Sequence, residues 1–109
     1  AVALSDGVAV GGGANANARS VSIGTQSPSQ SGQAVDTVSI GWAAGYTNQG
    51  QRGISIGREA GWQNAGFASI NLGYQTGRNS GSATVAIGEM AQRDNAGTRA
   101  IAIGISRWF

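Results

Sequence analysis

Two glutamates are the residues of this chain whose type and spacing could do chemistry. Glu59 and Glu89 each closely follow a glycine of a repeated motif. A glycosidase needs two carboxylates that face one sugar. The repeat places these two about 10 Å apart, on coils two steps from one another. Nothing in the sequence supplies a pocket around them, so we interpret them as solvated surface acids and expect no catalytic residues.

Missing residue types exclude other kinds of chemistry. The chain has no histidine and no cysteine. Without them there is no Ser-His-Asp triad, no Cys-His pair and no His/Cys metal site. We therefore expect a protein that is not an enzyme, with no cofactor and no metal.

Charge and hydropathy narrow the range of partners. Seven arginines are spread singly through the 109 residues, and the net charge is +2. This is not the clustered basic patch of a nucleic-acid-binding protein. No apolar run approaches the roughly 20 residues that span a bilayer. We expect neither a nucleic-acid partner nor membrane insertion.

A glycine-rich stretch offers a second motif to weigh. Gly11-Gly12-Gly13-Ala14 follows a short aliphatic run and looks like part of a dinucleotide fingerprint. That fingerprint opens a helix, and no helical pattern follows here. Gly11 also falls in the glycine column of the repeat. We therefore interpret the stretch as part of the repeat and not as a nucleotide site.

Large side chains in two repeat columns are the candidates for binding. One column lies one place after the repeated glycine and the other lies five places after it, and both mix aromatic residues with arginine. Such surfaces hold sugars or another protein. Alternatively, these side chains pack between protomers or onto a neighbouring module, with arginine stacked on tryptophan. The candidate ligand or subunit contacts are Trp42, Tyr46, Arg58, Trp62, Tyr74, Arg78 and Arg93.

A repeat positions all of these residues. Its unit reads branched aliphatic, small or polar residue, aliphatic, glycine. The closing glycines Gly11, Gly24, Gly41, Gly57, Gly73, Gly88 and Gly104 are separated by 13, 17, 16, 16, 15 and 16 residues. Self-similarity at a nearly fixed period is the signature of a solenoid.

Each unit predicts a short strand, because its alternation sends both aliphatics to one face. We expect that face to point inward. The residue between the aliphatics is always small, which suggests close approach of another surface. The predicted structural core is Val21, Ile23, Val38, Ile40, Ile54, Ile56, Ile70, Leu72, Val85, Ile87, Ile101 and Ile103.

Two corners and two short strands are expected in each coil of about 16 residues. The first corner is the repeated glycine. The second is a column of turn-forming residues seven places later: Asn48, Asn64, Ser80 and Asn95. Asparagine and serine favour such turns. Coils that stack at about 4.8 Å would make a rod about 30 Å long.

The chain divides into three expected regions. Residues 1–7 are interpreted as an N-terminal cap or incoming strand, residues 8–104 as seven coils, and residues 105–109 as a C-terminal cap. Residues 25–37, which include Pro28, are interpreted as a polar insertion loop. Two aliphatics and an alanine per turn make a thin core, so we expect an obligate oligomer.

The repeat resembles the YadA-like head repeats of trimeric autotransporter adhesins, which are also found in bacteriophage tail fibres. The copies that carry the resemblance are Ile54-Ser55-Ile56-Gly57-Arg58-Glu59-Ala60 and Val85-Ala86-Ile87-Gly88-Glu89-Met90-Ala91. The resemblance covers residues 8–104 and implies an all-β fold: a left-handed parallel β-roll, homotrimeric, with the aliphatics inside each roll. Repeats of that family are nearer 14 residues, so the coils here are longer.

The sequence and the resemblance together lead to one expected function. It is a structural and adhesive module of a trimeric fibre, extracellular on a bacterial surface or a virion tail. Its partners would be other fibre or baseplate modules and a host glycan or surface protein. Two alternatives are a polysaccharide-degrading tailspike enzyme and a monomeric ice- or mineral-binding solenoid.

Overall fold

A computed structural model gives the architecture of the chain. It describes residues 2–3, 6–16, 18–24, 35–45, 50–62, 65–78, 81–91 and 98–105. Within these residues all regular structure is β. The strands are β1 (Val2–Ala3), β2 (Val8–Val10), β3 (Asn15–Ala16), β4 (Val21–Ile23), β5 (Val38–Ile40), β6 (Ile54–Ile56), β7 (Ile70–Leu72), β8 (Val85–Ile87) and β9 (Ile101–Ile103).

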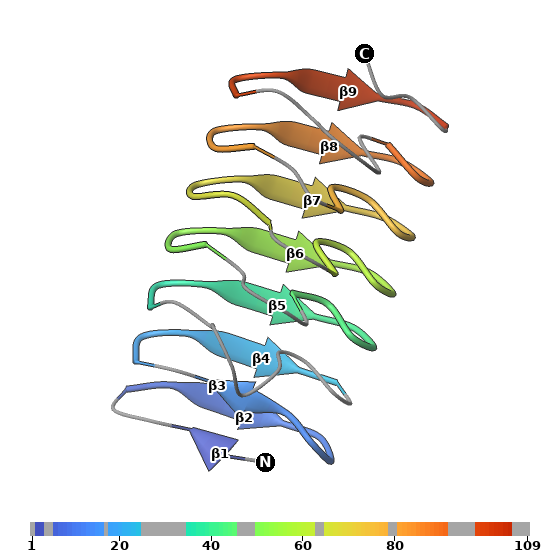
Figure 1. Ribbon diagram of the computed structural model, residues 1–109. Coiled ribbons are helices and arrows are strands. Elements are labelled where there is room, and N and C mark those ends of the chain that lie inside the picture. Colours follow the sequence, from blue (N-terminus) through green and yellow to red (C-terminus); the bar gives the residue numbers. More distant parts are fainter. Residues whose placement is uncertain are drawn as a thin grey trace.

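Seven of these strands form one parallel sheet in the order β2-β4-β5-β6-β7-β8-β9. The register is constant: the first aliphatic of each strand pairs with the first aliphatic of the next, as Ile54 does with Ile70. Each strand belongs to one coil, and the coils stack as a ladder (Figure 1). The molecule measures 37 × 20 × 17 Å. The predicted all-β parallel solenoid, with about 16 residues per coil, is confirmed.

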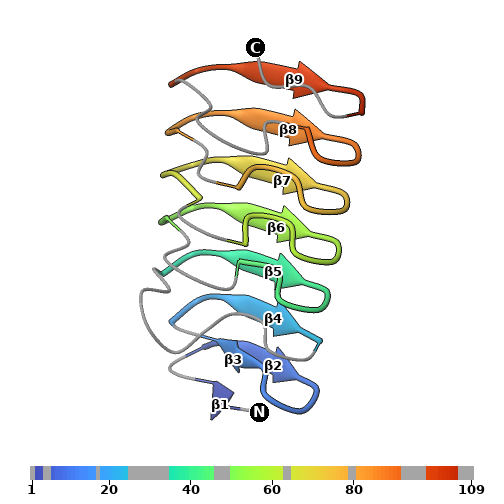
Figure 2. The same ribbon diagram turned by 45° about the vertical axis from the view of Figure 1, so that its right-hand side comes forward.

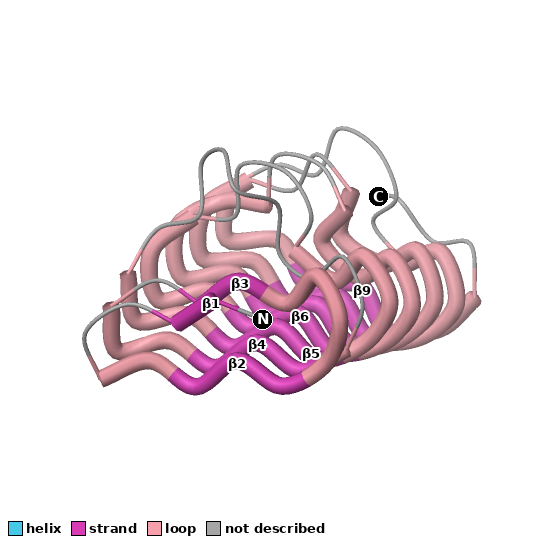
Figure 3. Tube along the Cα trace, turned by 90° about the horizontal axis from the view of Figure 1, so that it is seen from below, coloured by secondary structure: helices cyan, strands magenta, loops and turns pink. Residues whose placement is uncertain are grey.

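The first coil has two strands, β2 and β3, as the sequence predicted, whereas each later coil has one strand in its described residues. Viewed along the stack, the seven strands of the large sheet line one side, and β1 and β3 form a separate pair (Figure 3). Two turn residues break the chain just after the strand: Glu59 has φ 58° and Gly61 has φ 57°. This left-handed conformation, repeated within three residues, is incompatible with an extended strand. The expected second corner at Asn48, Asn64, Ser80 and Asn95 lies outside the described residues.

The backbone of each turn is hydrogen-bonded to the equivalent turn of the neighbouring coil. The amide of Glu59 donates to the carbonyl of Trp42 at 2.8 Å, and the amide of Gln75 donates to that of Arg58 at 3.0 Å. On the other side of the strands, Ala83 N donates to the carbonyl of Phe67 at 2.8 Å. The turns stack beside the sheet (Figure 2), and these hydrogen bonds satisfy their backbone groups, so the turns repeat as regularly as the strands do.

The orientation of the strands contradicts the predicted core. The middle residue of each strand from β4 to β9 is buried; Ser55 and Ala86, for example, are 0% exposed. The aliphatic residues on either side of it lie on the outer face. The interior of the coil is too narrow for two branched side chains, and small residues fill it. The residues expected inside but found half-buried or exposed on the outer face are Val21, Ile23, Val38, Ile40, Ile54, Ile56, Ile70, Leu72, Val85, Ile87, Ile101 and Ile103.

The interior is built from alanine and hydroxyl side chains. Ser20, Thr37, Ser69 and Thr84 occupy the place before the strand and are buried. Their hydroxyls are satisfied locally: Ser69 Oγ donates to the carbonyl of Gly66 at 2.8 Å, and Thr84 Oγ1 donates to that of Gly81 at 3.2 Å. A buried hydroxyl with a partner carries little penalty. The core is therefore narrow and polar, with little apolar area of its own.

In the coils of β6 and β7, one glycine of the turn makes room for the middle residue of the strand. A Cβ on Gly61 would collide with Ser55 Oγ, and one on Gly77 would collide with the amide oxygen of Asn71. In the next coil the sequence has alanine, Ala86, as the middle residue and Gln92 in place of the glycine. The small middle column thus approaches the far wall of its own coil.

We expect Gly77→Ala to lower the free energy of unfolding by about 3 kcal/mol, because it combines overpacking with a left-handed φ of 63°. Adding Asn71→Ala should restore about 2 kcal/mol, since it removes the colliding amide. Urea denaturation of the two single variants and the double variant measures this coupling. Strict additivity of the two substitutions would contradict the proposed contact.

The expected terminal regions and the insertion are only partly described. The segment interpreted as an N-terminal cap or incoming strand contains β1, which pairs in parallel with β3. Most of the polar insertion and all but Ile105 of the expected C-terminal cap lie outside the described residues.

Candidate functional site: an aliphatic face between two charged rims

The outer face of the seven-stranded sheet is an unbroken aliphatic surface. Two columns of valine, isoleucine and leucine run along it, one residue of each per strand. Val8, Ile23, Ile56 and Ile87 are 49%, 36%, 37% and 36% exposed. With six steps between seven strands, the aliphatic face is about 30 Å long and about 10 Å wide. Continuous apolar patches of this kind are candidates for interaction surfaces.

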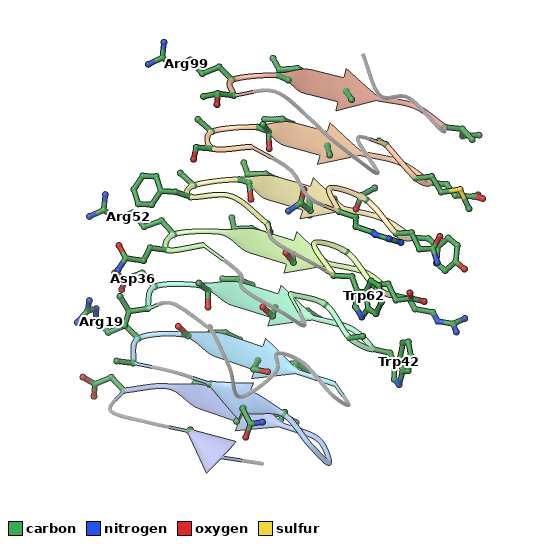
Figure 4. All side chains as sticks on the ribbon, in the orientation of Figure 1. Arg19, Asp36, Trp42, Arg52, Trp62 and Arg99 are labelled. Carbon is green, nitrogen blue, oxygen red and sulfur yellow. The ribbon has the colours of Figure 1, made fainter. Side chains whose placement is uncertain are left out.

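Five charged residues and two alanines line the edge of the aliphatic face where the strands begin. We call this edge the corner rim; its members stand two places before each strand. All have left-handed φ between 54° and 62°. Figure 4 shows four of them projecting from this edge. The corner rim consists of Asp6, Arg19, Asp36, Arg52, Ala68, Ala83 and Arg99.

Arg19 and Asp36 join neighbouring coils of the corner rim. Arg19 Nε donates to Asp36 Oδ1 at 2.7 Å, and Nη2 donates to Oδ2 at 3.1 Å. This two-pronged pair lowers the pKa of Asp36 below 3.8, chiefly through the hydrogen bond, and raises the pKa of Arg19. Because both groups are exposed to solvent, the ion pair contributes only modestly to stability.

The Asp36 pair predicts a small, specific loss of stability in acid. A carboxyl whose folded pKa is depressed contributes stability above its unfolded value, and this is lost as pH falls through the folded value. The stabilisation by the ion pair is therefore lost below pH 3.8, as the pH falls toward the lower pKa that Asp36 has in the folded state. Asp36→Asn, whose side chain tolerates the same backbone, should be less stable than wild type at neutral pH and equal to it in strong acid.

Urea midpoints of both proteins across this range measure the difference. Arg19→Gln serves as the reciprocal variant and should show the same convergence. A stability gap between wild type and Asp36→Asn that stays constant in acid would contradict the assignment.

Aromatic and arginine side chains, with one glutamate, occupy the opposite edge. We call this edge the aromatic rim; it consists of Trp42, Arg58, Trp62, Tyr74, Arg78 and Glu89. The guanidinium of Arg58 lies between two rings, 5.1 Å from the centroid of Trp42 and 5.8 Å from that of Tyr74. These three residues come from successive coils, one place after the repeated glycine. Cation–π contacts of this type stabilise the stacking of the coils.

A second stack lies beside the first. The guanidinium of Arg78 is 5.4 Å from the centroid of Trp62. Both labelled tryptophans project from the same edge of the sheet in Figure 4. A third stack, of Arg52 at 5.6 Å from the ring of Phe67, lies on the corner rim. Phe67 was not among the residues expected at a site.

The structure brings together most of the expected contact residues. Trp42, Arg58 and Tyr74 form one stack, and Trp62 and Arg78 form another. The remaining two, Tyr46 and Arg93, lie outside the described residues. These stacks lie within one chain, between successive coils, so packing between protomers or onto a neighbouring module stays a prediction.

The two glutamates have different surroundings. Glu59 lies 3.6 Å from Arg58 Nε, and its other oxygen accepts a hydrogen bond from Gln75 at 3.4 Å. Glu89 is exposed. In the described part of the chain, no three His, Cys, Asp or Glu side chains are placed to hold a metal ion. The same residues contain no helix long and apolar enough to cross a membrane.

No protein-family model, curated protein or solved structure matches the chain. The class of protein is therefore assigned from the fold and from the two rims alone. They define a parallel β-solenoid with a narrow polar interior and an apolar outer face.

Proposed function

We propose that the chain is a structural and adhesive module of a trimeric fibre, in which three copies pack their aliphatic faces around a common axis. The exposure of the aliphatic columns carries this proposal. A single copy buries only small side chains, whereas three copies would enclose the branched aliphatics in a shared core. That core would supply the apolar burial that the coil interior lacks.

A left-handed roll and a threefold assembly come from the resemblance to the head repeats of trimeric adhesins and tail fibres. Three rods with parallel axes would give each aliphatic face contact with both others. Closed rotational symmetry of this kind is usual for homo-oligomers. The stiffness of stacked coils, with hydrogen bonds at strands and corners alike, suits a fibre.

In such an assembly the rims and loops face outward and are available to a host glycan or surface protein. Three copies on one fibre would compensate for weak single-site binding through avidity. The fibre would stand on a bacterial surface or a virion tail, joined to other fibre or baseplate modules.

Glycan and surface-protein arrays test the adhesive role. The assembled wild-type protein is compared with the Ile56→Asp variant, which is designed to be monomeric. We expect retention of the assembled protein on at least one class of ligand and much weaker retention of the variant. An assembled protein that is retained by no ligand would contradict the adhesive role and leave only the structural one.

A further inference from the structure

We propose that Arg58 anchors a binding site on the aromatic rim for an anionic glycan, one that bears carboxylate or sulfate groups. The proposal rests on the adhesive function proposed above and names its ligand class. It starts from how the guanidinium is held, between the rings of Trp42 and Tyr74 at 5.1 and 5.8 Å.

Both ring contacts of Arg58 are cation–π contacts, which do not use its N–H donors. All N–H donors of arginine lie in the plane of the group, so rings above and below do not consume them. The side chain of Arg58 is 62% exposed. The guanidinium therefore presents its donors to solvent in a fixed orientation, which favours two-pronged binding of a carboxylate or sulfate.

Within the described residues, the contacts of Arg58 leave most of its N–H donors available to a ligand. Its nearest acidic neighbour, Glu59, is 3.6 Å away, beyond hydrogen-bond range for these atoms. Glu59 is also hydrogen-bonded to Gln75. An incoming anion would compete with a long contact rather than a tight ion pair.

Two further features favour a charged glycan over a neutral one. A neutral sugar is held mainly by stacking on an open ring face, and the ring faces toward Arg58 are already covered. A second guanidinium, that of Arg78 over Trp62, stands on the same edge one coil away. Two guanidiniums on one edge favour a ligand that carries more than one negative charge.

Binding of three polysaccharides measures the proposal: polygalacturonate for carboxylate, sulfated dextran for sulfate, and dextran as the neutral probe. The variant Arg58→Lys keeps the charge and loses the planar fork. Arg52→Lys is the matched control, since Arg52 is also stacked on a ring but lies on the other rim. Glu59→Gln removes the competing carboxylate. The molar mass of every variant is measured alongside.

Wild type should bind at least one charged polymer and not dextran, with affinity that falls as salt is raised. Arg58→Lys should weaken binding about tenfold, and Arg52→Lys should leave it unchanged. Glu59→Gln should strengthen it about threefold.

Three results would overturn the proposal. The first is binding of dextran as strong as that of the charged polymers, or no binding of either charged polymer. If the protein has the trimeric mass in that experiment, the assembly proposal would survive this result. The second is equal losses in Arg58→Lys and Arg52→Lys. The third is a lower molar mass of Arg58→Lys, which would place Arg58 at a subunit interface.

Discussion

Replacing Gly57 with alanine is expected to cost about 4 kcal/mol of folding stability per chain. Gly57 closes β6 with φ 123°, a conformation that L side chains rarely adopt. The added Cβ would lie 2.5 Å from the carbonyl oxygen of Gly73 in the next coil. That atom belongs to the backbone, so it cannot move aside without breaking the ladder.

The ladder at this point holds the stack together. The amide of Gly57 donates to the carbonyl of Ile40 at 2.8 Å, and the amide of Gly73 donates to that of Ile56 at 2.9 Å. We expect the midpoint of thermal unfolding to fall by roughly 15 °C or more. Calorimetry or circular dichroism measures it.

Gly12→Ala is the control for this substitution. A Cβ at Gly12 meets nothing within 4 Å. Its unfolding midpoint should stay at the wild-type value or rise slightly, because alanine restricts the unfolded chain. Equal losses in the two variants would contradict the account of the glycine column.

Replacing Ile56 with aspartate is expected to dissociate the assembly while leaving the coil folded. Ile56 lies on the aliphatic face in the central strand β6 and is 37% exposed in one copy. In a threefold assembly each substitution would put a charge into the shared core, at a cost of about 3 kcal/mol per copy. A single copy would tolerate it, because the side chain faces water there.

Light scattering on a size-exclusion column measures the mass, and circular dichroism reports the fold. Gln51→Asp adds the same charge at an exposed position three places before β6, so it should leave the mass unchanged. If Ile56→Asp keeps the wild-type mass, the aliphatic face is not the interface.

Much of the architecture could be predicted from the repeat. Every copy of the motif from Val8-Ala9-Val10 to Ile101-Ala102-Ile103 is a strand in the structure. The columns also placed Trp42, Arg58 and Tyr74 at one repeat position on successive coils, and the structure shows these three side chains in contact. Their role toward a ligand or a neighbouring subunit stays a prediction.

The side on which the aliphatics lie could not be read from alternation. A period of two defines two faces but does not say which one is enclosed. The deciding signal was a pairing between distant columns: Ser55 with Gly61 and Asn71 with Gly77. A middle residue whose size is matched to a turn residue must face that turn, so the aliphatics must face outward.

The stack of Arg52 on Phe67 was missed for a different reason. The two residues occupy adjacent repeat columns on neighbouring coils, and a search within single columns does not align them. The ion pair of Arg19 with Asp36 lies within one column, two places before the strand, and could have been found.

The molar mass of the wild-type protein in solution tests most directly the claim that the aliphatic face is a subunit interface. Each chain has a mass of 10.9 kDa. Light scattering across a dilution series should give three times that value at every concentration at which the protein stays folded. A folded protein that has the mass of one chain throughout the series would contradict the claim.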